Sequence, residues 1–446
     1  MNFRGIKRKI FKNLIDKKFF ISDGSQKIYG NLIKKIIFEK IKIIEKKNLK
    51  GNTIAILKNK CGLIYWVNLI VAYLCNFTIY PEINSSKIDK HYNNIIIFDG
   101  ENITFKKNKC KKKTHIGKFD IIFSSSGSTG EPKLILQTLS SLLKNTNYVL
   151  DKIKFKKNRN FMMCIPYVYT SAICHFFACI ISGTNFYAIE KTIFPSDLKE
   201  KLKKNNINYF GGPPIHSKWI IDFLNKNLPN FNKLISSGDF LSEETINKFL
   251  KKENKLNFFY MYGISEVGGR FCINKIQNNN YKYSVGKPLK YMKIVNREDD
   301  QKEIVVKSKD LFYGYYTKDK FLEHKGNFYS TGDVGTIKNG NLFLSGRTSE
   351  IFKSSGVMVY PQFIYKELIK TKWFNEVFIF KGYIKDYGNV PFCAFSATKK
   401  ISSEQIVKYL KNKIPNEQIP KKIKQVTKFP RLGNNKIDKQ SIINTF

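Results

Sequence analysis

The sequence predicts an α/β fold, with a large N-terminal domain of parallel βαβ sheets and a β-rich subdomain, followed by a small α+β C-terminal domain. Three observations predict it. Strand-type and helix-type segments alternate over residues 52–262, the segments after about Tyr281 are β-rich with glycine turns, and the residues after Arg347 form a shorter set of strands and one helix. A chain of 446 residues is long enough to bury more than one core.

The first βαβ unit is expected at residues 52–80. NTIAILKN has the pattern of a buried strand, CGLIYWVNLIVAYLC that of an apolar helix, and FTIY that of a second strand. Further on, a strand ending near Tyr209 leads through the turn GGPP into the helical segment IHSKWIIDFLNKN. The strand FNKLISSGD then precedes a helix that Ser242 caps, and the strand LNFFYMYG follows. Such alternation favours a parallel sheet.

The C-terminal part of the chain has a different pattern. KEIVVKS, NFYSTGD and GTIKNGNLFLSGR indicate strands joined by glycine turns. Beyond Arg347, EVFIFKGYI and PFCAFSATK indicate two strands, and SSEQIVKYLKNKI indicates a helix with a capping box between Ser402 and Gln405. We place the domain boundary near Ser349, which gives domains at residues 1–348 and 349–446.

The formal net charge of +43 raises the question of nucleic-acid binding, because clustered cations displace counterions from phosphate backbones. Only seven of the 78 cationic residues are arginine, and the lysines are spread from Lys7 to Lys439. Arginine supplies the bidentate contacts on which nucleic-acid recognition depends. We therefore expect a surface of solvated lysines and no nucleic-acid partner.

Cysteine usage and hydropathy favour a cytoplasmic protein. The eight cysteines include no Cys-x-x-Cys pair, and the five histidines show no metal-ligand spacing. Charges interrupt the apolar residues near the N-terminus, so no signal peptide is expected. The most apolar stretches, at residues 63–80 and 161–189, contain polar residues such as Asn68 and His175. Buried helices are therefore expected there, and no transmembrane segment.

The stretch FSSSGSTGEPKLILQ, residues 123–137, has the composition of a phosphate-binding loop that follows a strand. Its hydroxyl groups can donate hydrogen bonds, its glycines allow close approach of the backbone, and Lys133 supplies a positive charge. It is not a mononucleotide P-loop. Counting from Gly127, the second glycine position holds Pro132 and the final hydroxyl position holds Leu134. On its own the loop equally suits a polar turn.

Further stretches, in order and spacing, resemble the signature motifs of the acyl-adenylate-forming superfamily, which contains acyl-CoA synthetases, adenylation domains of peptide synthetases and luciferases. The opening loop resembles that family's Thr-Ser-Gly-Thr-Thr-Gly-x-Pro-Lys stretch. The others are MYGISEVGG, NFYSTGDVG, LSGRTSEIFKSSGVMVYP and the terminal FPRLGNNKIDKQSI, with weaker matches at SVGKPL, LFYGYY and SSGDFL. The resemblance extends from about Asn52 to the C-terminus.

The resemblance implies a role for each matching residue. The ATP- or AMP-binding residues would be Ser125, Ser126, Gly127, Ser128, Thr129, Gly130, Lys133, Tyr262, Gly263, Ser265, Asp333 and Arg347. The catalytic residues would be Lys436 and Glu266, with Glu266 also holding Mg²⁺, and the acyl pocket would be lined by Tyr169, Gly238, Val267 and Gly268. Ser355 and Gly356 would contact the thiol's pantetheine arm, and Ser349 would be the hinge of a mobile C-terminal domain.

These residue types suit those roles chemically. Asp333 can accept hydrogen bonds from ribose hydroxyls, and Arg347 can donate to ribose or phosphate. The carboxylate of Glu266 is a suitable Mg²⁺ ligand beside a polyphosphate. Lys436 can reach charge that develops at the α-phosphate. Taken singly, each of them also suits a turn residue or a surface charge.

The sequence departs from the family pattern at three places. Ser349 stands at the hinge where Asp or Lys is usual, Asn435 stands where Gly precedes the catalytic lysine, and residues 363–365 read Phe-Ile-Tyr where Glu-Ile-Glu is usual. The opening loop begins about 120 residues into the chain, which is early for the family, so the N-terminal subdomain is expected to be trimmed.

The implied activity is that of an ATP-dependent acid–thiol ligase with ATP, Mg²⁺ and coenzyme A. Amino-acid-activating relatives carry an Asp in the segment that corresponds to IPYVYTSAICHF, whereas this segment has no acidic residue. An unpaired ammonium group would be costly in such a pocket, so a fatty, aryl or other non-amino carboxylic acid is favoured. The alternatives are an enzyme that loads the phosphopantetheine of an acidic acyl carrier protein, and a degenerate AMP-binding protein without ligase activity.

Overall fold

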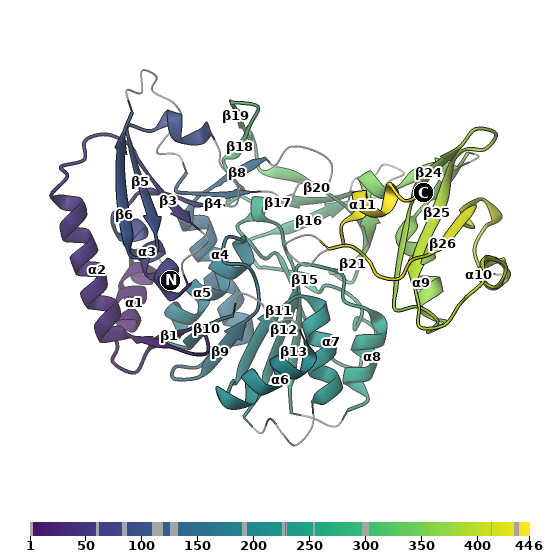
Figure 1. The fold of residues 1–446 in the computed structure, drawn as a ribbon, viewed down its shortest axis with the longest axis horizontal. Helices are drawn as coiled ribbons and strands as arrows, with labels where there is room; N and C mark the ends of the chain where they lie inside the picture. The colour runs from purple at the N-terminus through teal and green to yellow at the C-terminus, as the bar shows by residue number, and fades with distance from the viewer. Residues whose placement is uncertain are drawn as a thin grey trace. The chain divides into compact units, whose positions relative to one another are not determined.

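The computed structural model describes residues 3–58, 62–82, 87–108, 119–124, 133–189, 194–224, 228, 230–252, 255–296, 303–354, 356–411, 413–431 and 437–446. Contacts between residues divide the chain into two compact units, and Figure 1 shows the elements of both. Unit 1 consists of Met1–Lys293 and Lys307–Phe328, and unit 2 of Ile294–Val306 and Tyr329–Phe446. The predicted boundary near Ser349 lies inside unit 2. The boundary at Ser349 remains a proposal, namely that the residues after it move as a C-terminal domain.

Unit 1 contains an eight-stranded mixed sheet. Its order is β19 (Lys320–Glu323), β18 (Gly314–Thr317), β8 (Leu134–Gln137), β7 (Ile121–Ser124), β4 (Thr78–Glu82), β3 (Thr53–Lys58), β5 (Asn94–Asp99) and β6 (Asn102–Lys107). The strands β3 and β4 pair in parallel, and α3 (Gly62–Leu74) connects them. This confirms the βαβ unit predicted at residues 52–80.

The second sheet of unit 1 has nine strands. Its order is β15 (Lys287–Pro288), β14 (Cys272–Lys275), β13 (Asn257–Tyr262), β12 (Lys233–Ser237), β11 (Tyr209–Gly212), β9 (Asn160–Met163), β10 (Asn185–Ala188), β1 (Phe20–Ser22) and β2 (Lys27–Tyr29). The five strand pairs from β13 to β1 in this order are all parallel, whereas β14 and β2 pair antiparallel with β13 and β1. The alternating pattern of residues 206–262 therefore predicted the sheet type correctly.

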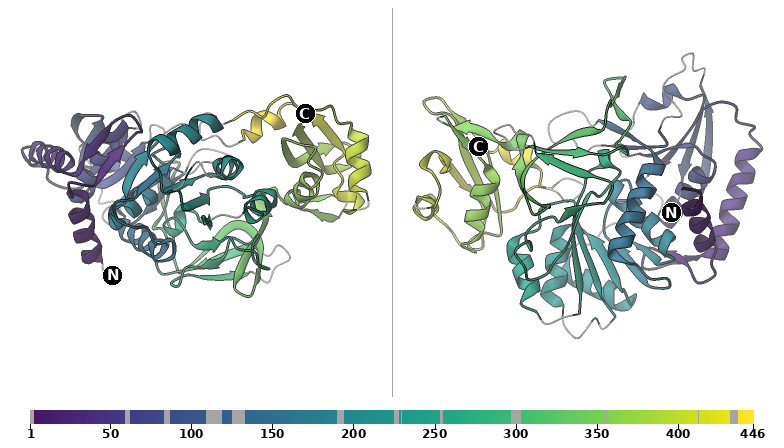
Figure 2. Two further views of the ribbon diagram at one scale, coloured as in Figure 1. Left: turned by 90° about the horizontal axis from the view of Figure 1, so that it is seen from below. Right: turned by 180° about the vertical axis from the view of Figure 1, so that it is seen from behind.

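Helices fill the space between these two sheets and flank them (Figures 1 and 2). The inner layer includes α3, α4 (Leu139–Ile153) and α5 (Thr170–Ser182), of which α3 contacts β3 and β4 while α5 contacts β9 and β10. The ring of Trp66 on α3 lies 4.7 Å from that of Phe176 on α5 and 5.0 Å from that of Phe186 on β10. A helix packed on two sides must be apolar nearly all round, which explains the composition of α3 and α5.

The remaining helices of unit 1 lie outside this layer. The N-terminal pair is α1 (Phe3–Leu14) and α2 (Gly30–Glu45), and α6 (Pro195–Lys204), α7 (Pro214–Phe223) and α8 (Glu243–Leu250) lie along β11 to β13 (Figure 1). The predicted cap of α8 is present, since Ser242 accepts a hydrogen bond from the Thr245 backbone. Among the described residues, no helix has the length and apolar character needed to cross a membrane.

Unit 2 is built on smaller sheets. They are β16 (Lys293–Asn296), β17 (Glu303–Lys307), β20 (Phe328–Lys338) and β21 (Asn341–Arg347); the hairpin of β22 (Phe352–Ser354) and β23 (Val357–Val359); and β24 (Glu376–Ile384), β25 (Gly388–Ser396) and β26 (Lys422–Gln425). Its helices are α9 (Pro361–Ile369), α10 (Ser403–Leu410) and α11 (Lys439–Ile443). Four short 3₁₀ turns complete the described chain, at Lys87–His91 (η1), Ser265–Val267 (η2), Thr348–Glu350 (η3) and Asn416–Gln418 (η4).

The C-terminal residues of unit 2 have their own core, in which α9 and α10 pack on the sheet β24-β25-β26. Ile364, Val377, Phe395 and Ile406 are among its buried members. The capping box is present, since Ser402 and Gln405 exchange hydrogen bonds across the first turn of α10. The α+β module predicted after Arg347 is therefore confirmed, with β25 beginning three residues earlier than expected, at Gly388.

Candidate active site

The carboxyl ends of β11, β12 and β13 bring together several segments that the sequence singled out. Gly238 directly follows β12, Tyr262 ends β13, and Tyr169 precedes the first residue of α5. Ligands of parallel α/β sheets bind at this end of the strands. The hydroxyl- and glycine-rich residues at positions 125–130 lie outside the described residues, and Lys133 is described just before β8.

Lys133 and Glu266 both contact one aromatic side chain, Tyr315 of β18. The Tyr315 hydroxyl donates a hydrogen bond of 2.9 Å to Oε1 of Glu266. The Lys133 Nζ lies 5.6 Å from the centre of the same ring, within range of a cation–π contact. Two residues predicted to act on the ATP phosphates and Mg²⁺ are therefore near neighbours, although 133 positions separate them in sequence. The sequence reasoning missed Tyr315, which lies in the weakly matching stretch LFYGYY.

The turn η2, which carries Ser265 and Glu266, is held by bonds to its main chain. The Phe312 backbone N–H donates to the Glu266 carbonyl at 2.8 Å, and the Gln137 amide donates to the Ser265 carbonyl at 3.3 Å. The hydroxyls of Ser265 and Thr170 are 2.6 Å apart, which ties η2 to the start of α5 beside Tyr169. The position of the Glu266 carboxylate therefore depends on β8, β18 and α5 together.

The glycines around η2 are required by close backbone contacts. A Cβ atom on Gly263 would lie 1.8 Å from the carbonyl oxygen of Gly269, so no side chain fits there. Gly268 has φ +79°, a left-handed conformation that favours glycine, and a Cβ there would meet the Ser141 hydroxyl at 2.8 Å. Val267 between them is fully buried. The backbone of the predicted acyl-pocket segment is thus closely packed on α4.

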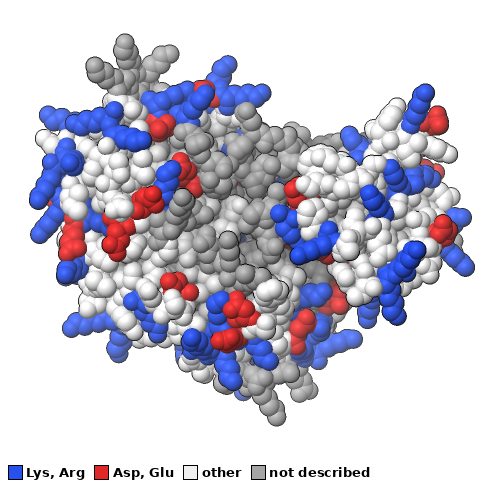
Figure 3. All heavy atoms as spheres, in the orientation of Figure 1, with Lys and Arg blue, Asp and Glu red and all other residues white. Residues whose placement is uncertain are grey.

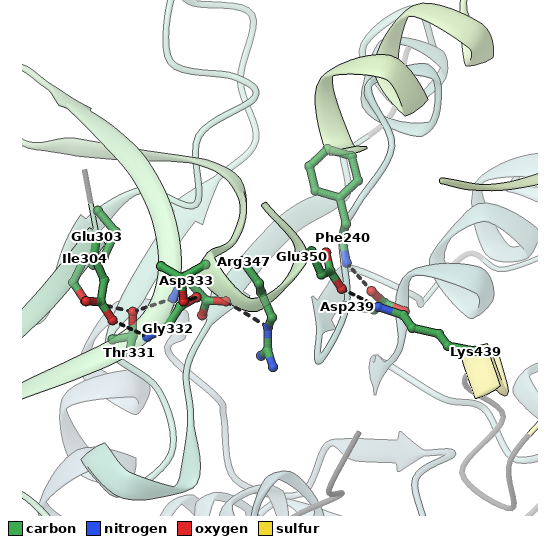
Figure 4. A network of polar contacts seen from close by, with 11 residues as sticks. Asp239, Phe240, Glu303, Ile304, Thr331, Gly332, Asp333, Arg347, Glu350 and Lys439 are labelled. Atoms are coloured by element: carbon green, nitrogen blue, oxygen red, sulfur yellow. Dashed lines mark hydrogen bonds and ion pairs between the residues drawn. The ribbon is translucent and has the colours of Figure 1, made fainter. Parts of the chain in front are cut away.

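Asp333 and Arg347 meet in unit 2, where they are paired across the antiparallel strands β20 and β21 (Figure 4). The Arg347 Nε lies 2.9 Å from Oδ1 of Asp333, whose side chain is only 8% exposed, while that of Arg347 is 55% exposed. The preceding residues of β20 are fixed by two hydrogen bonds. Thr331 donates to the Ile304 carbonyl at 2.8 Å, and the Gly332 N–H donates to Glu303 at 2.9 Å. The structure brings these two predicted nucleotide-binding residues into direct contact.

The other predicted residues of the C-terminal part are only partly described. Lys436 and Ser355 lie outside the described residues. Gly356 has φ +83° and open space at its Cβ position, and Ser349 is exposed within η3. Glu350, the next residue of that turn, forms an ion pair with Lys439 at the start of α11. The residues flanking 432–436 also pair, through a bridge between Arg431 and Ile437.

Arg270, which follows the predicted acyl-pocket residues Val267 and Gly268, was not among the residues predicted from the sequence. Arg270 is 6% exposed, and its guanidinium donates a hydrogen bond of 3.0 Å to the hydroxyl of Ser237 at the end of β12. Its apolar context, GGRFCI, was the available signal of burial. His175 on α5 is also buried, as expected, and burial together with the nearby Arg270 charge lowers the pKa of His175 to about 3.

The described residues are compatible with the predicted use of Mg²⁺. Only Oε1 of the half-buried Glu266 accepts the Tyr315 hydrogen bond, and a hard cation bound to polyphosphate typically needs one or two protein carboxylates. Within the described ranges there is no cluster of three His, Cys, Asp or Glu side chains that would form a metal cage. Glu266 is therefore the fitting Mg²⁺ ligand among the predicted residues.

Comparison with known proteins decides the family. Residues 89–316, half of the chain, match the model of the family described as AMP-binding enzyme. The chain belongs to the AMP-binding enzyme family. It is accordingly an adenylate-forming ligase, and the match includes Lys133, Glu266 and Tyr315.

Individual members of the family are similar to the chain over much of its length. It is 24% identical over 370 residues to the D-alanine–D-alanyl carrier protein ligase of Bacillus cytotoxicus, covering 76% of this chain and 73% of the relative. MatB from Rhodopseudomonas palustris, solved with ATP bound, superposes with a TM-score of 0.81 at 16% identity, covering 98% of both chains. The o-succinylbenzoate coenzyme A synthetase MenE of Bacillus subtilis, solved with ATP and magnesium, gives a TM-score of 0.78 at 16% identity, covering 98% of this chain and 99% of that one. These two structures confirm the predicted adenylate-forming fold.

Proposed function

We propose that this protein is an ATP-dependent acid–thiol ligase, which activates a non-amino carboxylic acid as its acyl-adenylate and transfers the acyl group to coenzyme A. The observation that carries the proposal is the arrangement of Lys133, Tyr315 and Glu266, which lies inside the family match and places a cation next to a carboxylate suited to Mg²⁺.

In the first half-reaction, a carboxylate oxygen of the acid forms a bond to the α-phosphorus of ATP, and the bond from that phosphorus to the pyrophosphate oxygen breaks. Both reactants are anions, so the protein must align them and neutralise charge. We assign Lys133 to the departing β- and γ-phosphates and Lys436 to the α-phosphate. Mg²⁺, when bound at Glu266, would supply further positive charge to the polyphosphate.

In the second half-reaction, the thiol gives up its proton to solvent and its sulfur forms a bond to the acyl carbon. The bond from that carbon to the AMP oxygen breaks, and AMP leaves. We assign Asp333 and Arg347 to the ribose and phosphate of the nucleotide in both steps. Ser355 and Gly356 are proposed to contact the pantetheine arm, with Ser349 as the hinge between the two steps.

The choice of a fatty, aryl or other non-amino acid rests on charge. The segment around Tyr169 contains no acidic residue that could pair with an ammonium group. Arg270, buried nearby at the end of β12, adds a positive charge to the same region. An ammonium group brought close to that guanidinium would be repelled. We also propose a cytoplasmic location, because the six cysteines in the described part of the chain are free thiols.

The second candidate acceptor is the phosphopantetheine of an acyl carrier protein. The curated relatives favour it, since they are ligases that act on a carrier protein. A net charge of +43 would also attract an acidic carrier. The two acceptors use the same thiol chemistry and differ only in what holds the pantetheine.

The experiment that tests the proposal is pyrophosphate exchange into ATP with a broad panel of carboxylic acids, comparing the wild type with Lys436→Ala. At least one acid is expected to support exchange that the variant loses. If no acid does so, the protein is a degenerate AMP-binding protein. The thioester yield from the best acid, on coenzyme A and on a holo-carrier protein, then identifies the acceptor.

A further inference from the structure

Arg270 is a buried cation without an acidic partner among the described residues. A guanidinium carries five N–H donors and stays protonated. Within the described part of the chain, however, the Arg270 side chain has one hydrogen bond, to the neutral Ser237 hydroxyl at 3.0 Å. No Asp or Glu in the described ranges lies within ion-pair distance of it. Burying such a charge unpaired is costly, so the group is expected to serve a purpose other than stability.

The backbone of Arg270 is held independently of its side chain. The Arg270 N–H donates to Oδ1 of Asn145 on α4 at 3.0 Å, and the Asn145 amide donates back to the Arg270 carbonyl. The same Asn145 amide also donates to the Tyr291 hydroxyl at 2.8 Å. The main chain is therefore fixed by neutral partners, and the guanidinium is not needed to hold this segment in place.

The described side chains around the guanidinium carry no compensating negative charge. Cys174 on α5 is buried, and burial raises the pKa of its thiol, which keeps it neutral. His175 beside it is neutral because burial and the Arg270 charge depress its pKa. The buried Nε2 of His175 has no hydrogen-bond partner among the described atoms, and its ring packs against Gly211 of β11.

The hydroxyl that accepts the Arg270 hydrogen bond lies at the carboxyl end of a parallel strand. Ser237 ends β12, on the side of the sheet that Gly211 and Ile235 share with it in the parallel register. The next residue, Gly238, is exposed, and a Cβ atom there would meet no heavy atom within 4 Å. The hydroxyl that Arg270 holds is therefore followed in sequence by an exposed, open position, at the strand ends where ligands bind.

We propose that the acid activated by this enzyme carries a second anionic group, most simply a second carboxylate, and that Arg270 receives it with the help of Ser237. This specificity deepens the proposed ligase function and rests on it. One carboxylate of the substrate is adenylated, while the other remains ionised and neutralises Arg270. Planar carboxylates suit the fork of N–H donors on arginine.

The first test compares matched acids in pyrophosphate exchange. Each pair consists of a dicarboxylic acid and the monocarboxylic acid of equal length, in an aliphatic series and an aromatic series. The wild type is expected to prefer the dicarboxylic member by at least roughly 100-fold in kcat/KM, because the monoacid leaves a buried charge unpaired. Equal rates within the pairs, or a preference for monoacids, would overturn the inference and leave the ligase function standing. Inactivity with every acid would instead reject the ligase function.

The second test replaces the cation. In Arg270→Met, the preference for the diacid is expected to disappear while activity on the monoacid stays within about threefold or rises. The free variant should melt at the same or a higher temperature than the wild type, since it loses an unpaired buried charge. Equal losses on both acids, together with a lower melting temperature, would mean that Arg270 is a structural residue.

Two controls keep the comparison specific. Arg159→Met removes an exposed arginine before β9 and should retain the diacid preference. Ser237→Ala should weaken the preference without abolishing it, and it serves as the test variant if Arg270→Met does not fold. Adding the free diacid should raise the melting temperature of the wild type and not that of Arg270→Met. A rise of the same size in both proteins counts against the inference.

Discussion

Tyr315 orders two opposite charges whose roles in the proposed reaction are complementary. Its hydroxyl holds one oxygen of Glu266, and its ring faces the ammonium of Lys133. Each contact contributes little free energy by itself. Together they hold the Glu266 carboxylate and the Lys133 amine against the same tyrosine. Lys133 directly follows residues 125–132 in sequence, which contain most of the predicted phosphate contacts.

Lys133 should act in one half-reaction only. In Lys133→Met, the adenylation rate is expected to fall roughly 100-fold, because a charge on the departing pyrophosphate is lost at the transition state. Thioester formation from preformed acyl-adenylate should stay within about twofold of wild type, since no pyrophosphate takes part. Single-turnover measurements of each step will show this.

The matched control for this variant is Lys282→Met. Lys282 likewise lies over a tyrosine ring, 5.1 Å from the centre of Tyr283, but outside the predicted motifs. Both half-reactions should proceed normally in that variant. An equal loss of both steps in Lys133→Met would contradict the assignment to pyrophosphate.

His175 makes stability depend on pH. Its pKa is about 3 in the folded chain and about 6.5 when unfolded, so the unfolded state binds the proton more readily between these values. Stability from this residue is fully present above pH 6.5 and is lost as the pH falls. Going from pH 7.5 to 5.5 should cost about 1.4 kcal/mol through this histidine alone.

The measurement is urea unfolding at both pH values for the wild type and His175→Asn. The variant is less stable at pH 7.5 but should lose about 1.4 kcal/mol less on acidification. Tyr387→Phe, at an exposed position between β24 and β25, should keep the wild-type difference. An unchanged pH response in His175→Asn would show that His175 does not cause it.

At the scale of elements, the site depends on the tight packing of η2 against the segment that follows it. Gly263 approaches the Gly269 carbonyl so closely that the two ends of the turn touch. The hydrogen bond from the Phe312 N–H to the Glu266 carbonyl adds a second constraint, from the chain just before β18. The carboxylate of Glu266 is therefore placed by backbone packing.

Gly263→Ala tests this packing. The added methyl would overlap backbone atoms, which cannot turn aside as a side chain can, so the loss of stability is expected at about 1–3 kcal/mol or more. Adenylation should fall as well, because η2 must shift. Thermal unfolding and pyrophosphate exchange will measure both effects. Gly388→Asn is the control, since asparagine tolerates the φ of +69° at that position and no heavy atom lies within 4 Å of its Cβ position. A stable and active Gly263→Ala variant would contradict the packing argument.

Elements with local signals were predictable from the sequence, and contacts between distant segments were not. The apolar stretch of α3 and the Ser402–Gln405 capping box both appear where the local pattern indicated. Tyr315 and Arg270 were missed because their roles come from partners 49 and 33 positions away, Glu266 and Ser237. The hydrophobic periodicity of a segment indicates which of its faces is buried, but it does not indicate which side chains distant in sequence will be in contact.

At the scale of the whole molecule, the charge of +43 bears on the acceptor more than on the fold. On the face shown in Figure 3, lysine and arginine are interspersed with aspartate and glutamate over the described surface. Ion pairs such as Lys58–Glu82 and Lys248–Asp222 form across elements. The excess of positive charge can attract an acidic carrier protein or the phosphates of coenzyme A, and salt would weaken both attractions.

The hinge proposal concerns the chain as a whole, because two half-reactions at one nucleotide call for two arrangements of the C-terminal residues. Ser349 is exposed and belongs to η3, while Glu350 anchors that turn to α11 through Lys439. A short exposed side chain leaves the backbone dihedrals at this position free to change.

Ser349→Pro should uncouple the two half-reactions. Proline fixes φ at position 349 and disfavours a helical conformation of Thr348, so the chain can no longer exchange freely between two arrangements. We expect one half-reaction to fall by at least roughly tenfold relative to the other, while the melting temperature stays near that of the wild type. Pyrophosphate exchange measures the first step, and thioester formation from preformed acyl-adenylate measures the second. Ser349→Ala, which leaves the backbone free, should support both. If Ser349→Pro also supports both at wild-type rates, the hinge does not lie at this residue.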